Sequence, residues 1–160
     1  MTKTYVKVGN QKIDSSQVNL PSRDFRDAWV LNGDTIEVDL AKKNEILSDK
    51  VNKERRRRLE VGSVITVTGY GDIPVQGRDQ DQITILALEL SAKSMKDAGI
   101  TTASIPFRDR DNGSHMLTPD QCLELMSKAK QHAQAIYVAS WNLKDMAGIP
   151  KDYTNDKWWP

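Results

Sequence analysis

Residues 28–59 read AWVLNGDTIEVDLAKKNEILSDKVNKERRRRL, and this stretch decides the fold. It begins with two β-favouring runs, one on each side of Asn32-Gly33-Asp34. Asn-Gly is the strongest short hairpin signal, because both residues tolerate the positive φ of a tight turn between strands. Asp39 then follows as the N-cap of a long charged helix from Leu40 to about Glu60. The stretch therefore predicts a small β unit that leads directly into a helix.

The composition excludes several classes of function. The 160 residues are 38% hydrophobic and 28% charged, and 23 Lys and Arg balance 22 Asp and Glu. A chain this evenly charged has no global field that would recruit nucleic acid or an anionic membrane. Residues 1–13 lack the apolar core of a signal peptide, and no window approaches the ~20 apolar residues that span a bilayer. We expect synthesis in a cytoplasm and no membrane partner.

Two successive hairpin-then-helix units follow Gly62. In the first, the strand Ser63–Thr68 turns at Gly69 and returns over Ile73–Gln76. Asp79 is predicted to cap the following helix, which Gly99 ends. The apolar face of this helix is predicted to consist of Ile83, Leu86, Ala87, Leu90 and Met95.

The second unit spans residues 104–146. Asp111-Asn112-Gly113 is a hairpin turn between the strands Ser104–Arg108 and Ser114–Leu117. Thr118-Pro119-Asp120-Gln121 is a capping box with proline at the first helical position, and it opens the last helix. Two hairpins covered by two helices predict a small α+β domain.

The predicted fold class is therefore α+β, in three parts. Residues 1–60 form an N-terminal β-hairpin arm, with Thr4–Val8 paired to Gln11–Ile13, then the second hairpin and the long charged helix, and serve docking and assembly. Residues 61–147 form the α+β domain, and residues 148–160 form a C-terminal tail.

Large apolar side chains in the arm and the tail are candidate partner contacts. Phe25 and Trp29 form either a small local core or an exposed contact surface. The apolar stripe of the helix 40–60 is narrow, so this helix needs a partner helix or a docking groove. Two adjacent tryptophans at the terminus either fold back onto the domain or insert into a neighbouring subunit. The candidate contacts are Phe25, Trp29, Leu47, Val51, Trp158 and Trp159.

The four consecutive arginines Arg55–Arg58 have three interpretations. They are a solvated helix face with ion pairs, a contact for a partner protein, or a phosphate-binding patch. Glu54 and Glu60 lie beside the arginines, and no flanking aromatic residue is present to stack on bases. Nucleic acid is therefore not an expected partner.

Residues with catalytic or metal-binding chemistry are few. Cys122 and His132 are ten residues apart on one predicted helix, or about 15 Å at the α-helical rise. His115 lies on the preceding strand, and we expect no acid to orient it. The three residues do not have zinc-site spacing, and Asp109–Gly113 fails as a calcium loop because arginines fall where carboxylates are required. We predict no enzyme activity, no catalytic or metal-binding residues and no cofactor.

Two segments resemble proteins of tailed phages and prophages. The first is a segment in which a proline, then Phe-Arg and then Ala-Trp precede a short hairpin and an arginine-rich helix. The residues of this chain that resemble it are Leu20–Trp29, Asn32–Asp34 and Val38–Lys42. The second, about residues 52–146, resembles a domain family often encoded beside or within phage tail-fibre genes. The resemblance covers roughly residues 20–146 and brings no catalytic residues with it.

The resemblance implies a non-enzymatic structural protein of the virion tail, either a fibre component or a fibre adaptor. Its partners would be other tail or fibre proteins, and tail symmetry favours a homo-oligomer, as a closed ring or trimer. A fibre assembly chaperone, absent from the mature particle, is the alternative. A nucleic-acid accessory protein that uses Arg55–Arg58 is a third hypothesis.

Overall fold

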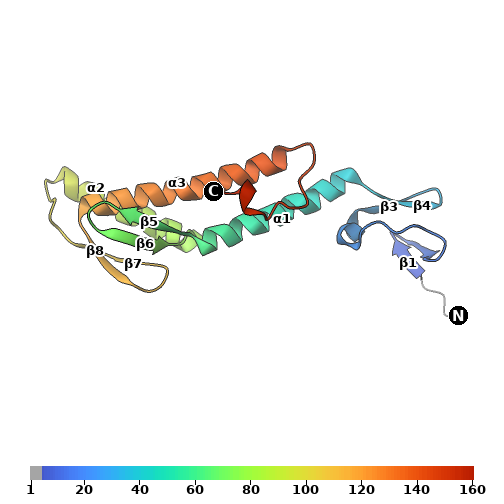
Figure 1. Ribbon diagram of the computed structural model, residues 1–160, viewed down its shortest axis with the longest axis horizontal. Coiled ribbons are helices and arrows are strands. Elements are labelled where there is room, and N and C mark those ends of the chain that lie inside the picture. The colour runs from blue at the N-terminus through green and yellow to red at the C-terminus, as the bar shows by residue number, and fades with distance from the viewer. Residues whose placement is uncertain (1–4) are drawn as a thin grey trace. The chain divides into compact units, whose positions relative to one another are not determined.

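The computed structural model describes residues 5–160, which divide into two compact units (Figure 1). The first unit holds the described residues up to Lys50 together with Ala147–Ile149, and the second holds Val51–Met146 with Pro150–Pro160. The fold class is α+β, as predicted. The sequence places its boundary ten residues later, after residue 60, and separates the last residues as a tail.

The first unit consists of two antiparallel hairpins and the beginning of a helix. Strand β1 (Tyr5–Val8) pairs with β2 (Gln11–Asp14), and β3 (Trp29–Asn32) pairs with β4 (Thr35–Val38). A 3-10 helix, η1 (Arg23–Ala28), leads into β3. Both predicted hairpins are confirmed, although Thr4, the predicted first residue of the first strand, lies outside the described residues.

Phe25 and Trp29 lie inside the first unit. Trp29 forms a small buried cluster with Val8 and Ile36, and its indole Nε1 donates to the carbonyl oxygen of Ser22 at 3.3 Å. Phe25 is buried as well, beneath two lysine ammonium groups, those of Lys43 and Lys50, 5.2 and 5.5 Å from the ring centre. The local-core interpretation of these two aromatics therefore agrees with their burial.

Helix α1 (Leu40–Val61) begins and ends as local chemistry requires. The Asp39 carboxylate accepts from the backbone N–H groups of Ala41 and Lys42 at 2.9 and 3.2 Å, which confirms the predicted cap. At the other end, Gly62 has a φ of +68°, and its N–H donates to the carbonyl of Arg58 at 2.9 Å. A Cβ on Gly62 would overlap the carbonyl oxygen of Val75, so glycine is needed there both for its φ and for its size.

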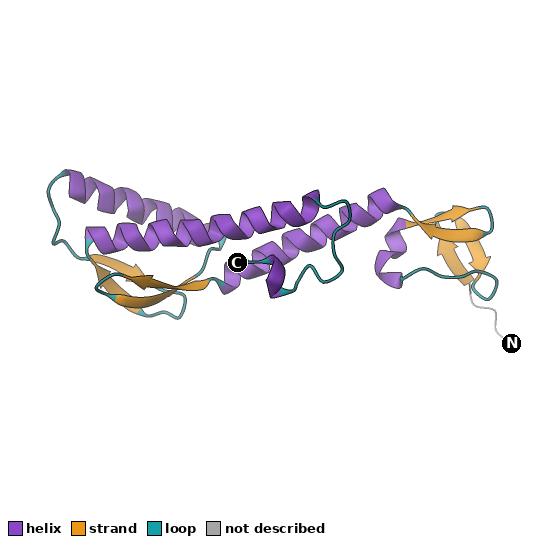
Figure 2. Ribbon diagram, turned by 45° about the horizontal axis from the view of Figure 1, so that its top comes forward, coloured by secondary structure: helices purple, strands orange, loops and turns teal. Residues whose placement is uncertain are grey.

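The second unit repeats a hairpin-then-helix order, as predicted. Its elements are β5 (Ser63–Val67), β6 (Gly71–Val75), α2 (Asp79–Asp97), β7 (Ile105–Arg108), β8 (Ser114–Leu117) and α3 (Pro119–Asp145). Each hairpin is a separate two-stranded sheet. Helices α2 and α3 pack side by side, and the two hairpins lie along them (Figure 2).

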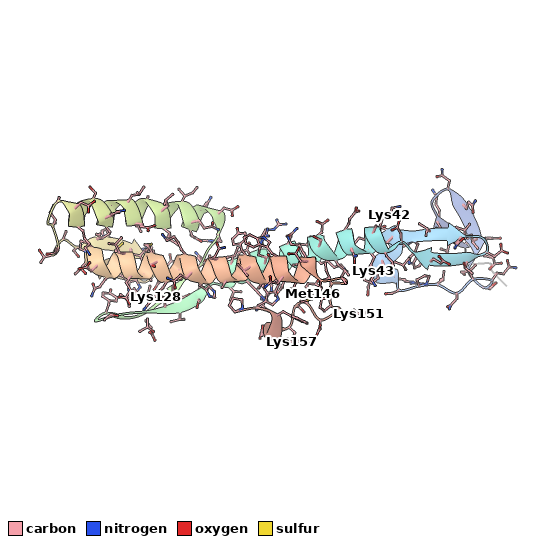
Figure 3. The ribbon with its side chains drawn as sticks, turned by 90° about the horizontal axis from the view of Figure 1, so that it is seen from above. Lys42, Lys43, Lys128, Met146, Lys151 and Lys157 are labelled. Atoms are coloured by element: carbon pink, nitrogen blue, oxygen red, sulfur yellow. The ribbon has the colours of Figure 1, made fainter. Side chains whose placement is uncertain are left out.

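Apolar residues from both hairpins and both helices meet in one core. Its fully buried side chains include Ile73, Leu117, Leu125 and Met126. Polar contacts tie α3 to the first hairpin at the edge of this core. Lys128, labelled in Figure 3, donates to the carbonyl of Thr66 at 2.8 Å and to the Glu124 carboxylate at 2.7 Å.

Two predictions about α2 are wrong. The N-cap residue is Arg78, whose backbone N–H donates to the Asp81 carboxylate at 3.1 Å, so Asp79 is the first helical residue. The apolar face is also misplaced: Ile85 and Ala92 are buried and Leu88 and Met95 pack against the core, whereas most of the predicted stripe faces outward. Both sets of residues recur at helical spacing, and periodicity alone does not say which one faces the core.

The remaining termini of the second unit follow the sequence. Thr118 caps α3, and Gln121 reciprocates by accepting from the Thr118 N–H at 3.0 Å. After α3 the chain returns to the same unit, where η2 (Asp156–Trp158) precedes a buried Trp159. The Trp159 Nε1 donates to the carbonyl of Tyr153 at 2.7 Å. Of the two predicted positions for the terminal tryptophans, the folded-back one describes Trp159.

Candidate functional site

The second unit contains a groove of about 520 Å³ beside helix α2. Ile83 and Leu86 of α2 form one wall, and Ala133 and Tyr137 of α3 form the other. Gly77, two residues after β6 ends, also lines the groove, and its N–H donates to the carbonyl of Leu59 at 2.8 Å. The groove is mainly apolar, with few polar groups that would fix the orientation of a small ligand.

Of the titratable groups that line the groove, Lys130 is engaged and His132 is neutral, whereas Asp79 is exposed and forms no ion pair among the described residues. Lys130 pairs with Glu89 across α2 and α3 at 2.6 Å. Burial lowers the pKa of His132, so its imidazole is neutral at physiological pH. The groove therefore suits an apolar side chain better than an anion.

Ile83, Leu86 and Leu90 continue this apolar surface along the outside of α2. Their side chains are 72%, 55% and 61% exposed. Monomeric proteins rarely leave contiguous large apolar side chains exposed without an interaction to use them. The groove and the three outward side chains of α2 together form the candidate interaction site.

A polar chain links the two hairpins of the second unit. The Asp109 carboxylate lies 2.7 Å from Nε2 of His115, and Nδ1 of His115 lies 3.1 Å from the Tyr70 hydroxyl. Assigned from these partners, Nε2 carries the proton toward Asp109 and Nδ1 accepts from Tyr70. The expectation that no acid orients His115 is therefore wrong.

Asp109 uses its carboxylate to hold the hairpin turn. It also accepts from the N–H groups of Asp111 and Gly113 at 2.8 and 2.7 Å. The hydrogen bond from His115 is the main cause that holds the pKa of Asp109 below its usual range, and the two backbone bonds add to it against the opposing effect of burial. A carboxylate with three donors stabilises the turn and positions His115 against Tyr70.

The thiol of Cys122 lies within the core. Its side chain is fully buried, and Sγ is 3.9 Å from the carbonyl of Leu88. Burial, followed by the charge of Glu89, raises the pKa of the thiol, so it is protonated and inaccessible at neutral pH. Cys122 is a packing residue in this fold.

The arginine block is divided among several roles. Glu54, itself buried, accepts from Arg57 at 2.6 Å and from Arg58 at 2.8 Å, and the bond to Arg57 is the main cause that lowers the pKa of Glu54. The Arg55 guanidinium lies 4.8 Å from the ring centre of Tyr137. The ion-pair interpretation thus describes Arg57 and Arg58.

In residues 5–160, no group of three or more His, Cys, Asp or Glu side chains could hold a metal ion. No helix in the same part of the chain combines the length and the apolar character needed to cross a membrane.

A family model described as a domain of unknown function, DUF4376, matches residues 41–156. The chain belongs to the DUF4376 family. No curated protein and no solved structure matches the chain. The DUF4376 match includes nearly all of α1, both hairpin-then-helix units and Asp156, the residue that pairs with Arg58.

The predicted partner contacts are distributed across the DUF4376 boundary. Leu47 and Val51 lie within the match, whereas Phe25, Trp29, Trp158 and Trp159 lie outside it. Of the six, Trp158 is half-buried, and the other five are buried within the chain. Partner binding at these residues stays a prediction. Among them, Trp158 is the residue with side-chain surface that a partner could contact.

Sequence reasoning missed two features of the DUF4376 region. The outward position of Ile83, Leu86 and Leu90 carries no local signal. The pair of Asp109 and His115 does have one: Phe107 pairs with His115, and Asp109 follows Phe107 by two residues, directly after β7 ends. Such diagonal neighbours across a hairpin are within reach of each other.

Proposed function

We propose that this chain is a non-enzymatic structural protein of a bacteriophage tail, a fibre component or fibre adaptor that binds other tail or fibre proteins. The observation that carries the protein-binding role is the number of large apolar side chains left exposed on the folded second unit. They include Val64, Ile83, Leu86, Leu90, Val138, Trp141 and Met146. The tail setting is supported by the resemblance of residues 20–42 and 52–146 to phage and prophage proteins.

The end of α3 adds to this surface. A second, more open depression of about 840 Å³ lies there, and its lining includes Val138, Met146 and Trp158. Figure 3 labels Met146 at the end of α3 and Lys157 in the C-terminal segment. The two lysines in its lining, Lys130 and Lys157, are already paired with Glu89 and Asp152, so the depression offers mainly apolar surface to a protein partner.

The side chains that could act in catalysis are already used within the fold, and this supports a non-enzymatic role. Asp109 is occupied by three hydrogen-bond donors, and Cys122 is buried and protonated. Neither group lines the 520 Å³ groove, and the cavity that Asp109 lines has a volume of about 50 Å³. An active site would need such groups turned toward a cavity.

Mass spectrometry of purified virions tests the proposal. We expect the chain in particles made by the phage or prophage that encodes it, at a constant ratio to known tail proteins. The lysate of the same cells is the control. A protein abundant in the lysate and missing from particles would contradict a tail component and favour the alternative, a fibre assembly chaperone.

A further inference from the structure

Helix α2 has two apolar stripes, and the chain buries only one of them. The buried stripe is Ile85, Leu88, Ala92 and Met95. The exposed stripe is Ile83, Leu86 and Leu90, spaced by three and then four residues. This spacing keeps the three side chains on one side of the helix, as at the seam between two packed helices.

Charged residues extend the exposed stripe at both ends. Asp79 precedes Ile83 by four residues and Lys93 follows Leu90 by three, so the same seam spacing continues. Among the described residues, neither Asp79 nor Lys93 forms an ion pair, whereas Glu89 and Lys96, nearer to α3, are paired with Lys130 and Asp120. The seam therefore has a free negative charge at its N-terminal end and a free positive charge at its C-terminal end.

This charge order is complementary to itself in one orientation. An antiparallel copy of α2 places Asp79 of one chain beside Lys93 of the other, at both ends of the seam. In the same register, Leu86 of each chain faces Leu86 of the other at the two-fold axis, and Ile83 lies within one residue of the position opposite Leu90. A parallel copy would instead oppose Asp79 to Asp79 and Lys93 to Lys93, which is repulsive.

The groove gives the antiparallel pair a place for the apolar side chains. Ile83 and Leu86 form its α2 wall, opposite Tyr137 of α3. A Leu90 side chain that lies close to Ile83 of the other copy is placed over this groove. The two-fold symmetry fills both grooves in the same way, so one contact is made twice.

We propose that two copies of this chain form an isologous dimer through the exposed stripe 79–93 of α2, packed antiparallel with Leu90 of each copy over the groove of the other. The dimer replaces the ring or trimer that tail symmetry favours. It rests on residues of this chain alone and does not depend on a role in a phage tail.

Sedimentation equilibrium of the purified full-length protein tests the dimer over a concentration series of about 1–500 µM. We expect a monomer–dimer equilibrium. Leu86→Glu combined with Leu90→Glu should weaken association at least about tenfold, because two carboxylates would be buried in the seam without partners. Met116→Glu is the matched control, since Met116 is 56% exposed on β8, and should leave association unchanged.

A charge exchange tests the antiparallel orientation, independently of whether the apolar variants fold. Asp79→Lys and Lys93→Glu should each weaken self-association, because each variant repels its own copy at both ends. An equimolar mixture of D79K and K93E should associate as strongly as the wild type, because both ends then pair opposite charges. A wild-type protein that stays monomeric throughout the series, a trimer, or single variants that associate as strongly as the wild type would overturn the proposal.

Discussion

Gly62 stands where α1 must end and β5 must begin beside β6. Gly62→Ala should lower the free energy of unfolding by about 3 kcal/mol or more, since a positive φ alone costs an alanine about 1–2 kcal/mol and the clash with Val75 adds to it. Gly99→Ala is the control, because Gly99 has a φ of +74° and no atom within 4 Å of an added Cβ. Urea unfolding should show a clearly smaller loss for G99A; equal losses would mean that the close approach to Val75 has no effect.

Asp109 makes the stability of the hairpin depend on pH. Its pKa in the folded chain lies below that of an unfolded aspartate, about 4, so its contribution is complete above that pH and is lost as the pH falls through the lower folded value. Asp109→Asn removes this contribution. Urea unfolding should therefore find the wild type more stable than D109N at pH 5, with a smaller difference near pH 2. A stability difference that stays constant with pH would show that the charge of Asp109 does not contribute to the free energy of unfolding.

At the scale of the element, α2 turns one apolar stripe toward the core and the other away from it. Ile85→Ala should cost about 2–4 kcal/mol of stability, because it opens a cavity in the core. Ile83→Ala makes the same chemical change at an exposed position and should cost about 0.5 kcal/mol or less. Chemical denaturation followed by circular dichroism measures both. The reverse order would mean that the face predicted from the sequence is the buried one.

The elements that the sequence predicts well are those with local causes. Gly33 and Asn112 supply the positive φ of their turns, and Asp39 and Thr118 cap helices through groups two or three residues away. Which face of α2 turns inward has no local cause, because it depends on the side chains of the hairpins and α3 that pack against the helix. Propensity and spacing therefore locate the helix without orienting it.

The candidate site was less predictable than the elements. Its groove brings together residues near 59, 77, 83 and 137, and no sequence pattern joins positions so far apart. The link between Tyr70 and His115 joins two different hairpins and needs their packing to be known. Only the Asp109–His115 half follows from the register of a single hairpin.

At the scale of the whole molecule, the C-terminal segment returns to α1 within the second unit. The Arg58 guanidinium donates to the carbonyl of Thr154 and to Asp156, each at 2.8 Å, and lies 5.0 Å from the ring centre of Trp159. The same guanidinium also donates to the Glu54 carboxylate at 2.8 Å. Arg58 therefore links α1 to residues of the C-terminal segment that lie almost a hundred positions later in the sequence. The segment is part of the folded unit, and this explains why the compact unit extends to Pro160.

Trp159 and Trp158 therefore have unequal roles, although they are adjacent in the sequence. Trp159→Ala should lower the free energy of unfolding by about 3 kcal/mol, because it empties a buried aromatic site and removes the ring beneath Arg58. Trp158→Ala should cost less than about 1 kcal/mol, since Trp158 is only half-buried and its Nε1 bond to Asp152 is exposed. Urea unfolding of both variants beside the wild type measures the difference. If W158A proved as unstable as W159A, the packing of the terminal segment on Arg58 would not be what holds it in the unit.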